Sequence, residues 1–173
     1  CSELQRMLDD DQIRAIFFGR GGYGLVRIMD QLDFSRFCKH PKWLIGYSDI
    51  TCLHLHIHQH TAIISLHAHM GAAYHSDEQD VYSTQQLFHI LRGGKSDYQV
   101  SPHMTNRTGH AKAVLIGGNL ALISDLIGTA EDIDTNGKIL FIEDIGEQLY
   151  FTHQFKQVIL ELLHLVRVNL QIL

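Results

Sequence analysis

With 173 residues, of which 45% are hydrophobic and 19% charged, the chain has the composition of an ordinary folded domain and not of a disordered tail. Its formal charge of −5 comes without a basic stripe, so nucleic acid is not an expected partner. No run of about 18 apolar residues occurs, so no membrane interaction is expected either. The three cysteines are widely spaced without a C-x-x-C pair, which disfavours a disulfide framework or a zinc knuckle.

Five short apolar runs predict strands that are covered on both faces: residues 15–18, 43–45, 63–66, 113–116 and 139–142. Helical spacing of apolar side chains predicts helices between them, over residues 25–32, 81–91 and 120–127. Asn119 is a plausible N-cap for the last of these helices. Strand and helix in regular succession indicate an α/β fold with a mostly parallel sheet flanked by helices.

Polar segments follow three of the predicted strands. They are the glycine loop at residues 19–24, Gly46-Tyr47-Ser48-Asp49, and Glu143-Asp144. Parallel α/β sheets bind their ligands beyond the carboxyl ends of the strands. We therefore expect the loop, the serine and the carboxylates to share one rim.

Each of these segments has two interpretations when it is read alone. Ser48 could be a nucleophile on a tight turn beside main-chain N–H donors, although the strict G-x-S-x-G elbow is absent. Ser48 or Asp49 could equally be a helix N-cap. The glycine loop lacks a nucleotide-binding motif and is either a set of main-chain donors or a plain turn. Glu143 could orient a catalytic histidine or be a solvated acid.

Four histidines, His54, His56, His58 and His60, alternate after the serine. On a strand they would share a face and could bind zinc. A helix is the better prediction here, and it splits them into the pairs His54/His58 and His56/His60. We expect a half-exposed polar helix face with no metal and no cofactor, and keep a zinc site through His54 and His58 as an alternative. His67 and His69 remain candidates for lining the site.

Taken together, the ordered motifs resemble the serine LD-carboxypeptidase family, the muramoyltetrapeptide carboxypeptidases and their microcin-immunity relatives. The matching segments lie between about residues 10 and 150; they are Arg20–Gly24, Gly46–Thr51, Gly117–Leu120 with Gly128-Thr129, and Lys138–Asp144. The resemblance implies a flavodoxin-like or Rossmann-like N-terminal domain over residues 1–150. Residues 151–173 form an apolar tail without a recognised family motif, and the family's C-terminal domain is expected to be absent.

The resemblance also implies a function and a site. Members are cytoplasmic, metal-independent serine peptidases that cleave the L-to-D bond before the terminal D-alanine of a peptidoglycan tetrapeptide in wall recycling, and homodimers are common. Ser48 falls on the nucleophile, and Glu143 on the residue that orients the catalytic histidine. The oxyanion donors fall on the main-chain N–H of Asp49 and of Gly21 or Gly22. We expect Arg20, Tyr23 and Asn119 to contact the muropeptide.

Two departures from the family pattern qualify this expectation. Family chains begin earlier and continue into a domain that supplies the catalytic histidine, so we expect this chain to be a fragment with little or no activity. His153 follows Glu143 closely, but nothing matches it to that histidine. A noncatalytic domain that binds wall peptides is the alternative from another functional class.

Overall fold

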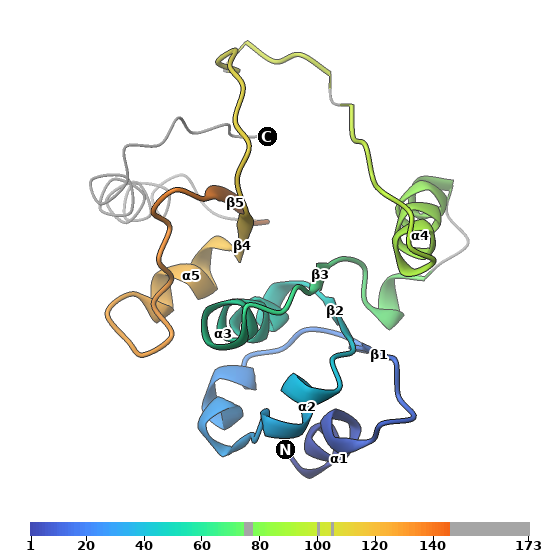
Figure 1. The fold of residues 1–173 in the computed structure, drawn as a ribbon. Coiled ribbons are helices and arrows are strands. Elements are labelled where there is room, and N and C mark those ends of the chain that lie inside the picture. The colour runs from blue at the N-terminus through green and yellow to red at the C-terminus, as the bar shows by residue number, and fades with distance from the viewer. Residues whose placement is uncertain (75–77, 100, 105, 146–173) are drawn as a thin grey trace.

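The structure, a computed structural model, describes residues 1–74, 78–99, 101–104 and 106–145. The tail at 151–173, with His153, lies outside these residues. The described chain is an α/β protein with parallel strands flanked by helices, which confirms the predicted fold class (Figure 1). The strands are β1 (Ala15–Phe17), β2 (Trp43–Gly46), β3 (Leu66–His67), β4 (Leu115–Asn119) and β5 (Ile139–Glu143). The α-helices are α1 (Ser2–Asp9), α2 (Ser35–Lys39), α3 (Thr51–Thr61), α4 (Glu78–Leu91) and α5 (Leu120–Leu126), and the 3-10 helices are η1 (Leu25–Gln31), η2 (Ser48–Ile50) and η3 (Gly71–Ala73).

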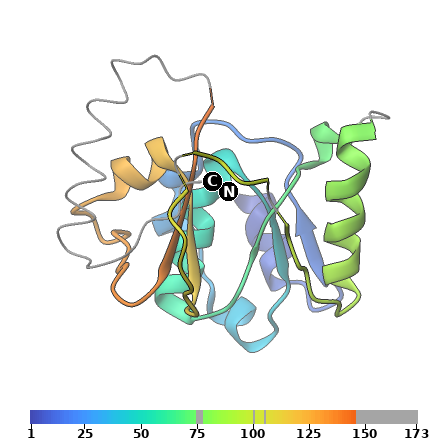
Figure 2. The ribbon, with the colours of Figure 1, turned by 90° about the horizontal axis from the view of Figure 1, so that it is seen from above.

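The described strands form two parallel sheets, one in the order β1-β2-β3 and one of β4 and β5. In the first, Ile16 pairs with Leu44, and Gly46 pairs with His67. In the second, Asn119 pairs with Glu143. Figure 2 shows the two sheets on either side of α3. Because neighbouring strands are parallel, the carboxyl ends of each sheet lie at one edge. The sequence predicted parallel strands but a single sheet, whereas the described strands form two.

Two strands begin later than predicted. Residues 63–65 are not strand, because α3 ends on Ala62 in the left-handed conformation (φ 56°) and the chain must first leave the helix. β4 starts at Leu115 and continues through Gly117 and Gly118, where the sequence suggested that the strand had ended. A Cβ atom at Gly117 would lie 1.8 Å from the carbonyl oxygen of Phe141 on β5, so only glycine permits this pairing.

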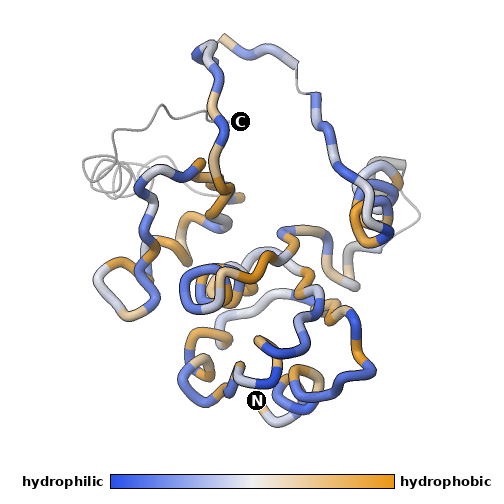
Figure 3. The backbone as a smooth tube through the Cα atoms, in the orientation of Figure 1, coloured by the Kyte–Doolittle hydropathy of each residue, from blue (hydrophilic) through white to orange (hydrophobic). Residues whose placement is uncertain are grey.

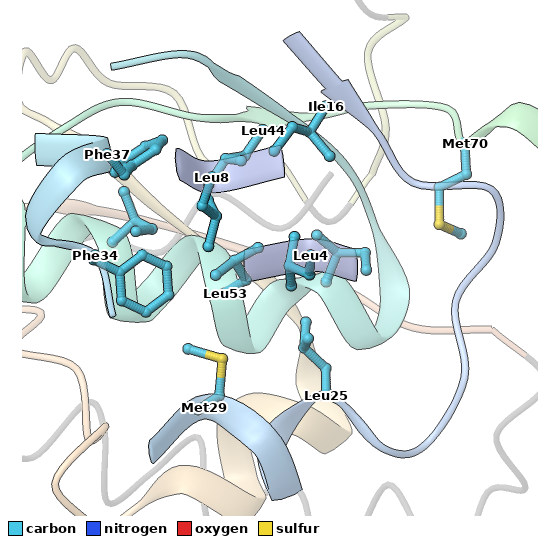
Figure 4. Packing of buried hydrophobic residues seen from close by; sticks show 12 residues of the cluster. Leu4, Leu8, Ile16, Leu25, Met29, Phe34, Phe37, Leu44, Leu53 and Met70 are labelled. Atoms are coloured by element: carbon cyan, nitrogen blue, oxygen red, sulfur yellow. The ribbon is translucent and has the colours of Figure 1, made fainter. Parts of the chain in front are cut away.

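Helix α3 is buried on two faces. Leu53 and Ile57 pack into one apolar cluster with α1, α2, η1, β1 and β2 (Figure 4). Cys52 and Leu55 pack into a second cluster, with residues of β4 and α5. The helix therefore holds the two sheets together. The N-terminal helices α1 and α2, which carry no strong sequence signal, contribute Leu4, Leu8 and Phe37 to the first cluster.

The connection from α4 to β4 arches away from the rest of the chain, and its residues are largely exposed (Figure 1). Figure 3 shows mostly hydrophilic to neutral residues along this arch, whereas apolar residues gather where the elements meet α3. Within the described ranges no helix is both long and apolar enough to cross a membrane.

A buried lysine fixes α1 against the first sheet. Lys42 precedes β2 and is only 4% exposed. Its Nζ donates hydrogen bonds to the carbonyl oxygens of Met7 (3.0 Å), Leu8 (2.8 Å) and Asp10 (2.8 Å). These carbonyls end α1 and have no partner within the helix, and a cation is favourable at this negative end of the helix dipole.

Replacing Lys42 with methionine keeps the apolar stem but removes the lysine hydrogen bonds to three carbonyl groups, of which that of Asp10 keeps another donor, the amide of Ile13 (3.1 Å). We expect Lys42→Met to lower the free energy of unfolding by about 2 to 4 kcal/mol. Urea denaturation followed by circular dichroism measures this. The exposed Lys39→Met is the control, with an expected change within about 0.5 kcal/mol. Equal effects of the two substitutions would contradict the capping role.

Candidate active site

Ser48 occupies a strained backbone conformation directly after β2. Its φ is 60°, in the left-handed region, where a residue with a Cβ atom is destabilised by about 1 to 2 kcal/mol. Such outliers concentrate at functional sites. The N-cap of α3 is Ile50, and no side chain caps that end. The interpretation of Ser48 or Asp49 as the N-cap of this helix is therefore wrong.

The glycine loop packs directly on the serine. A Cβ atom at Gly21 would lie 3.0 Å from Ser48 Oγ and 3.6 Å from the amide nitrogen of Asp49. At Gly22 it would lie 3.8 Å from the Asp49 carboxylate. Glycine thus allows the loop backbone to approach the hydroxyl, as a donor loop requires. The structure therefore brings together Ser48, Asp49, Gly21 and Gly22, which the sequence placed on one rim.

Asp49 joins the loop to the serine turn by its side chain. The residue is 6% exposed, and its Oδ2 accepts hydrogen bonds from the amides of Gly24 (3.2 Å) and Leu25 (3.1 Å). These amides begin η1, so the carboxylate caps that helix and not its own. A buried charge with two N–H donors is well compensated.

Glu143 ends β5 and lies beside His67. The two side chains are each 26% exposed, and His67 Nε2 is 3.8 Å from Glu143 Oε1, too long for a hydrogen bond. Burial, and then the nearby His54, lower the pKa of His67 to about 4. Burial, and then the charge of Asp144, raise the pKa of Glu143. His67 is therefore neutral near pH 7, a state that can accept a proton.

Asn119 connects the second sheet to the helix that follows the serine. Its amide donates to Thr51 Oγ1 (3.0 Å) on α3, and its side-chain Oδ1 accepts from Leu122 (3.2 Å), so it is the N-cap that the sequence predicted for α5. Its Nδ2 donates to Asp144 (3.4 Å). The close approach needs Gly118, where a Cβ atom would lie 2.6 Å from Thr51 Oγ1. Thr51 is a positioning residue that the sequence analysis missed.

A cavity of about 430 Å³ adjoins the rim. At the ends of β2 and β3 the cavity is lined by Tyr47, His67 and His69. On the opposite side it is lined by Leu87 and Ile90 of α4 and by Tyr98, which follows that helix. His67 and His69, the candidates for lining the site, thus line a cavity beside it, whose lining residues do not include Ser48 or Glu143. A larger hollow of about 700 Å³ lies along α4, around His89 and Arg92, and takes no residue from a strand end.

The other two predicted substrate contacts, Arg20 and Tyr23, are exposed in the glycine loop, and Tyr23 is 91% exposed. Neither lines the cavity described above. Their predicted contact with substrate therefore stays a prediction, as does that of Asn119, whose side chain is largely occupied by capping.

The histidine row differs from the prediction at its first member. His54 is buried, 6% exposed, with Nε2 at 2.9 Å from the carbonyl oxygen of Gly46, so it belongs to the core and not to a half-exposed face. The metal alternative through His54 and His58 is not supported, because the described residues bring together His56, His60 and Glu131 instead. Glu131 lies 75 residues after His56, and no sequence spacing signals the pairing.

Comparisons with known proteins identify the chain. Its fold is similar to that of a muramoyltetrapeptide carboxypeptidase from Oxalobacter formigenes (TM-score 0.78, 22% identity, covering 93% of this chain and 55% of that one). The microcin C7 self-immunity protein has the same fold (TM-score 0.81, 20% identity, covering 95% of this chain and 59% of that one). The chain belongs to the LD-carboxypeptidase family, whose N-terminal domain matches residues 1–68 and whose C-terminal domain matches residues 112–165.

Curated relatives agree with this assignment. A probable murein peptide carboxypeptidase of Bacillus subtilis is 40% identical over 154 residues, which are 86% of this chain and 48% of that protein. A murein tetrapeptide carboxypeptidase of Pseudomonas aeruginosa is 28% identical over 158 residues, which are 86% of this chain and 51% of that protein. The chain spans about half the length of these relatives. It does contain part of the C-terminal domain, which the sequence analysis expected to be absent.

The contact between the glycine loop and the serine predicts a specific sensitivity at Gly21. Gly21→Ala forces a methyl group against Ser48, and we expect it to lower the free energy of unfolding by about 1 to 3 kcal/mol. Gly19→Ala is the control, because nothing lies within 4 Å of a Cβ atom there. Chemical denaturation of both variants measures the difference, and a Gly21→Ala protein as stable as the control would show that the loop does not rest on Ser48.

The lowered pKa of His67 predicts a pH dependence of stability. Between about pH 4, where folded His67 titrates, and pH 6.5, where an unfolded histidine titrates, the unfolded chain binds more protons. Stability is therefore lost as the pH falls through this window. His54 contributes in the same direction, since burial also lowers its pKa, while the raised pKa of Glu143 acts in the opposite direction.

We expect His67→Gln to lose less stability than the unchanged chain between pH 7 and pH 5, in urea denaturation at both pH values. The exposed His40→Gln should lose as much as the unchanged chain. Equal losses in all three proteins would show that His67 is not held in its neutral form by the fold.

Proposed function

We propose that this chain carries the nucleophile of an LD-carboxypeptidase that releases the terminal D-alanine from a murein tetrapeptide in the cytoplasm. The observation that carries the proposal is the strained Ser48, with the glycine loop against its hydroxyl, in a chain of this family. The names of the relatives from B. subtilis and P. aeruginosa support murein peptides as the substrate class.

In the proposed reaction, Ser48 Oγ attacks the carbonyl carbon of the bond before D-alanine and gives its proton to a general base. The main-chain N–H groups of Asp49 and of Gly21 or Gly22 donate to the developing oxyanion. D-alanine leaves with a proton on its amine, and water then hydrolyses the ester on Ser48. The left-handed turn supports these roles because strained backbone conformations concentrate at functional sites.

The general base is a histidine oriented by Glu143 in this proposal. Among the described residues no histidine nitrogen forms a hydrogen bond with Ser48 Oγ, and His67 is the one beside Glu143. A serine without its base loses several orders of magnitude in rate. We therefore expect slow turnover by the 173-residue chain.

The cavity beside Tyr47 supports a small peptide as the ligand. Its volume of about 430 Å³ is within the range of small-molecule sites, about 300 to 1,000 Å³. It combines apolar walls from α4 with the polar rings of Tyr47, His67 and His69. The exposed guanidinium of Arg20 offers a bidentate partner for a peptide carboxylate.

The proposal is tested with the tetrapeptide L-Ala-D-Glu-diaminopimelate-D-Ala. We expect slow release of free D-alanine, measured by a coupled D-amino acid oxidase assay, and a fall to background in Ser48→Ala. Labelling with a fluorophosphonate, read by intact mass, should give one adduct that Ser48→Ala lacks. Ser35→Ala, an exposed serine outside the rim, is the control and should behave as the unchanged chain.

Release that persists in Ser48→Ala would refute the nucleophile. Tetrapeptide binding without turnover or labelling, unaffected by Ser48→Ala, would instead favour the noncatalytic peptide-binding domain.

A further inference from the structure

A second group of reactive side chains lies away from the rim, where the C-terminal end of α3 meets the loop after α5 (Figure 1). His56 Nδ1 is 2.8 Å from Glu131 Oε2, and His60 Nε2 is 3.4 Å from the same oxygen. The three ligand atoms all lie within 4.8 Å of one another. The hydrogen bond to Glu131 Oε2 satisfies His56 Nδ1. Because His60 Nε2 faces the same oxygen, one ion placed between the three side chains would contact all of them.

We propose that His56, His60 and Glu131 bind a Zn²⁺ ion. Two imidazole nitrogens and one carboxylate oxygen are a ligand set that zinc uses in proteins, with bonds of about 2.0 to 2.2 Å. Ligand atoms at this distance from a tetrahedral ion are about 3.3 Å apart. The two histidine-to-Glu131 separations, 2.8 and 3.4 Å, are already close to this value. The third separation, between the two imidazole nitrogens, is at most 4.8 Å, so binding the ion draws these rings together by up to about 1.5 Å.

The surroundings hold the ligands in place. The His56 ring lies against Phe34, with ring centroids 4.8 Å apart, and its side chain is only 16% exposed. The Glu131 amide donates to Thr129 Oγ1 (3.1 Å), whose hydroxyl donates to the carbonyl oxygen of Leu126 (2.6 Å). Such supporting contacts tune metal affinity. The His60 side chain is 43% exposed, which leaves a fourth coordination position accessible to water.

The position of this site separates it from the chemistry of the rim. His56 and His60 lie eight and twelve residues after Ser48, which corresponds to roughly 12 and 18 Å along a helix at about 1.5 Å per residue. The ion would join the end of α3 to the connection between α5 and β5. Its effect is therefore on the stability of the packing between the two sheets, and the inference does not rest on the proposed function.

The test uses the 173-residue chain after treatment with EDTA. Isothermal titration with Zn²⁺ should show one high-affinity ion per chain, and zinc should raise the melting temperature in proportion to the logarithm of its concentration. Co²⁺ should give visible d–d bands in place of zinc. His60→Asn and Glu131→Gln should each weaken zinc binding at least about tenfold and abolish the thermal shift.

His58→Asn is the matched control, because His58 lies on the same helix outside the cluster. With 13 histidines in the chain, only this comparison distinguishes the site from general histidine binding. His60→Asn changes a half-exposed side chain and should fold normally by circular dichroism, so it decides the matter if Glu131→Gln does not fold. Zinc binding that is equal in His60→Asn and His58→Asn, or absent at micromolar zinc in the unchanged chain, would overturn the proposal.

Discussion

The burial of α3 on two faces is the constraint on which the rest of the structure depends. Leu53 and Ile57 face one apolar cluster, and Cys52 and Leu55 face the other, so the helix cannot rotate without exposing one set. Its N-terminal end is thereby fixed in direction, and the turn from β2 into it must be made within a few residues. The left-handed Ser48 is the local response to that requirement.

The sequence predicted the architecture well because its signals are local. Apolar runs overlap each of the five strands of the described residues, and Asn119 marked the start of α5, since side-chain capping needs only neighbouring residues. The errors occur where tertiary contacts determine the bounds of an element. β4 continues through Gly117 because β5 approaches closely there, and glycine in a sequence ordinarily indicates the end of a strand.

For the site, too, local features could be predicted from the sequence, whereas features set by tertiary contacts could not. Ser48, the glycine loop and Glu143 were predicted from their order after strands, and the structure brings the first two into contact. His54 was misplaced because helical spacing gives the relative direction of side chains but not which direction is buried. Glu131 could not be found at all, since its partners are distant in the sequence and their meeting depends on how α5 packs on α3.

The two hydrogen bonds that Asp49 Oδ2 accepts have a consequence for motion. The loop cannot swing open for a ligand while the serine turn stays in place, because that would leave a buried charge without its donors, at about 1.5 to 3 kcal/mol for each bond. The glycine loop and the serine turn are consequently held together as one unit. Selectivity among ligands is then set by the shape of the cavity beside Tyr47 and not by closure of this loop.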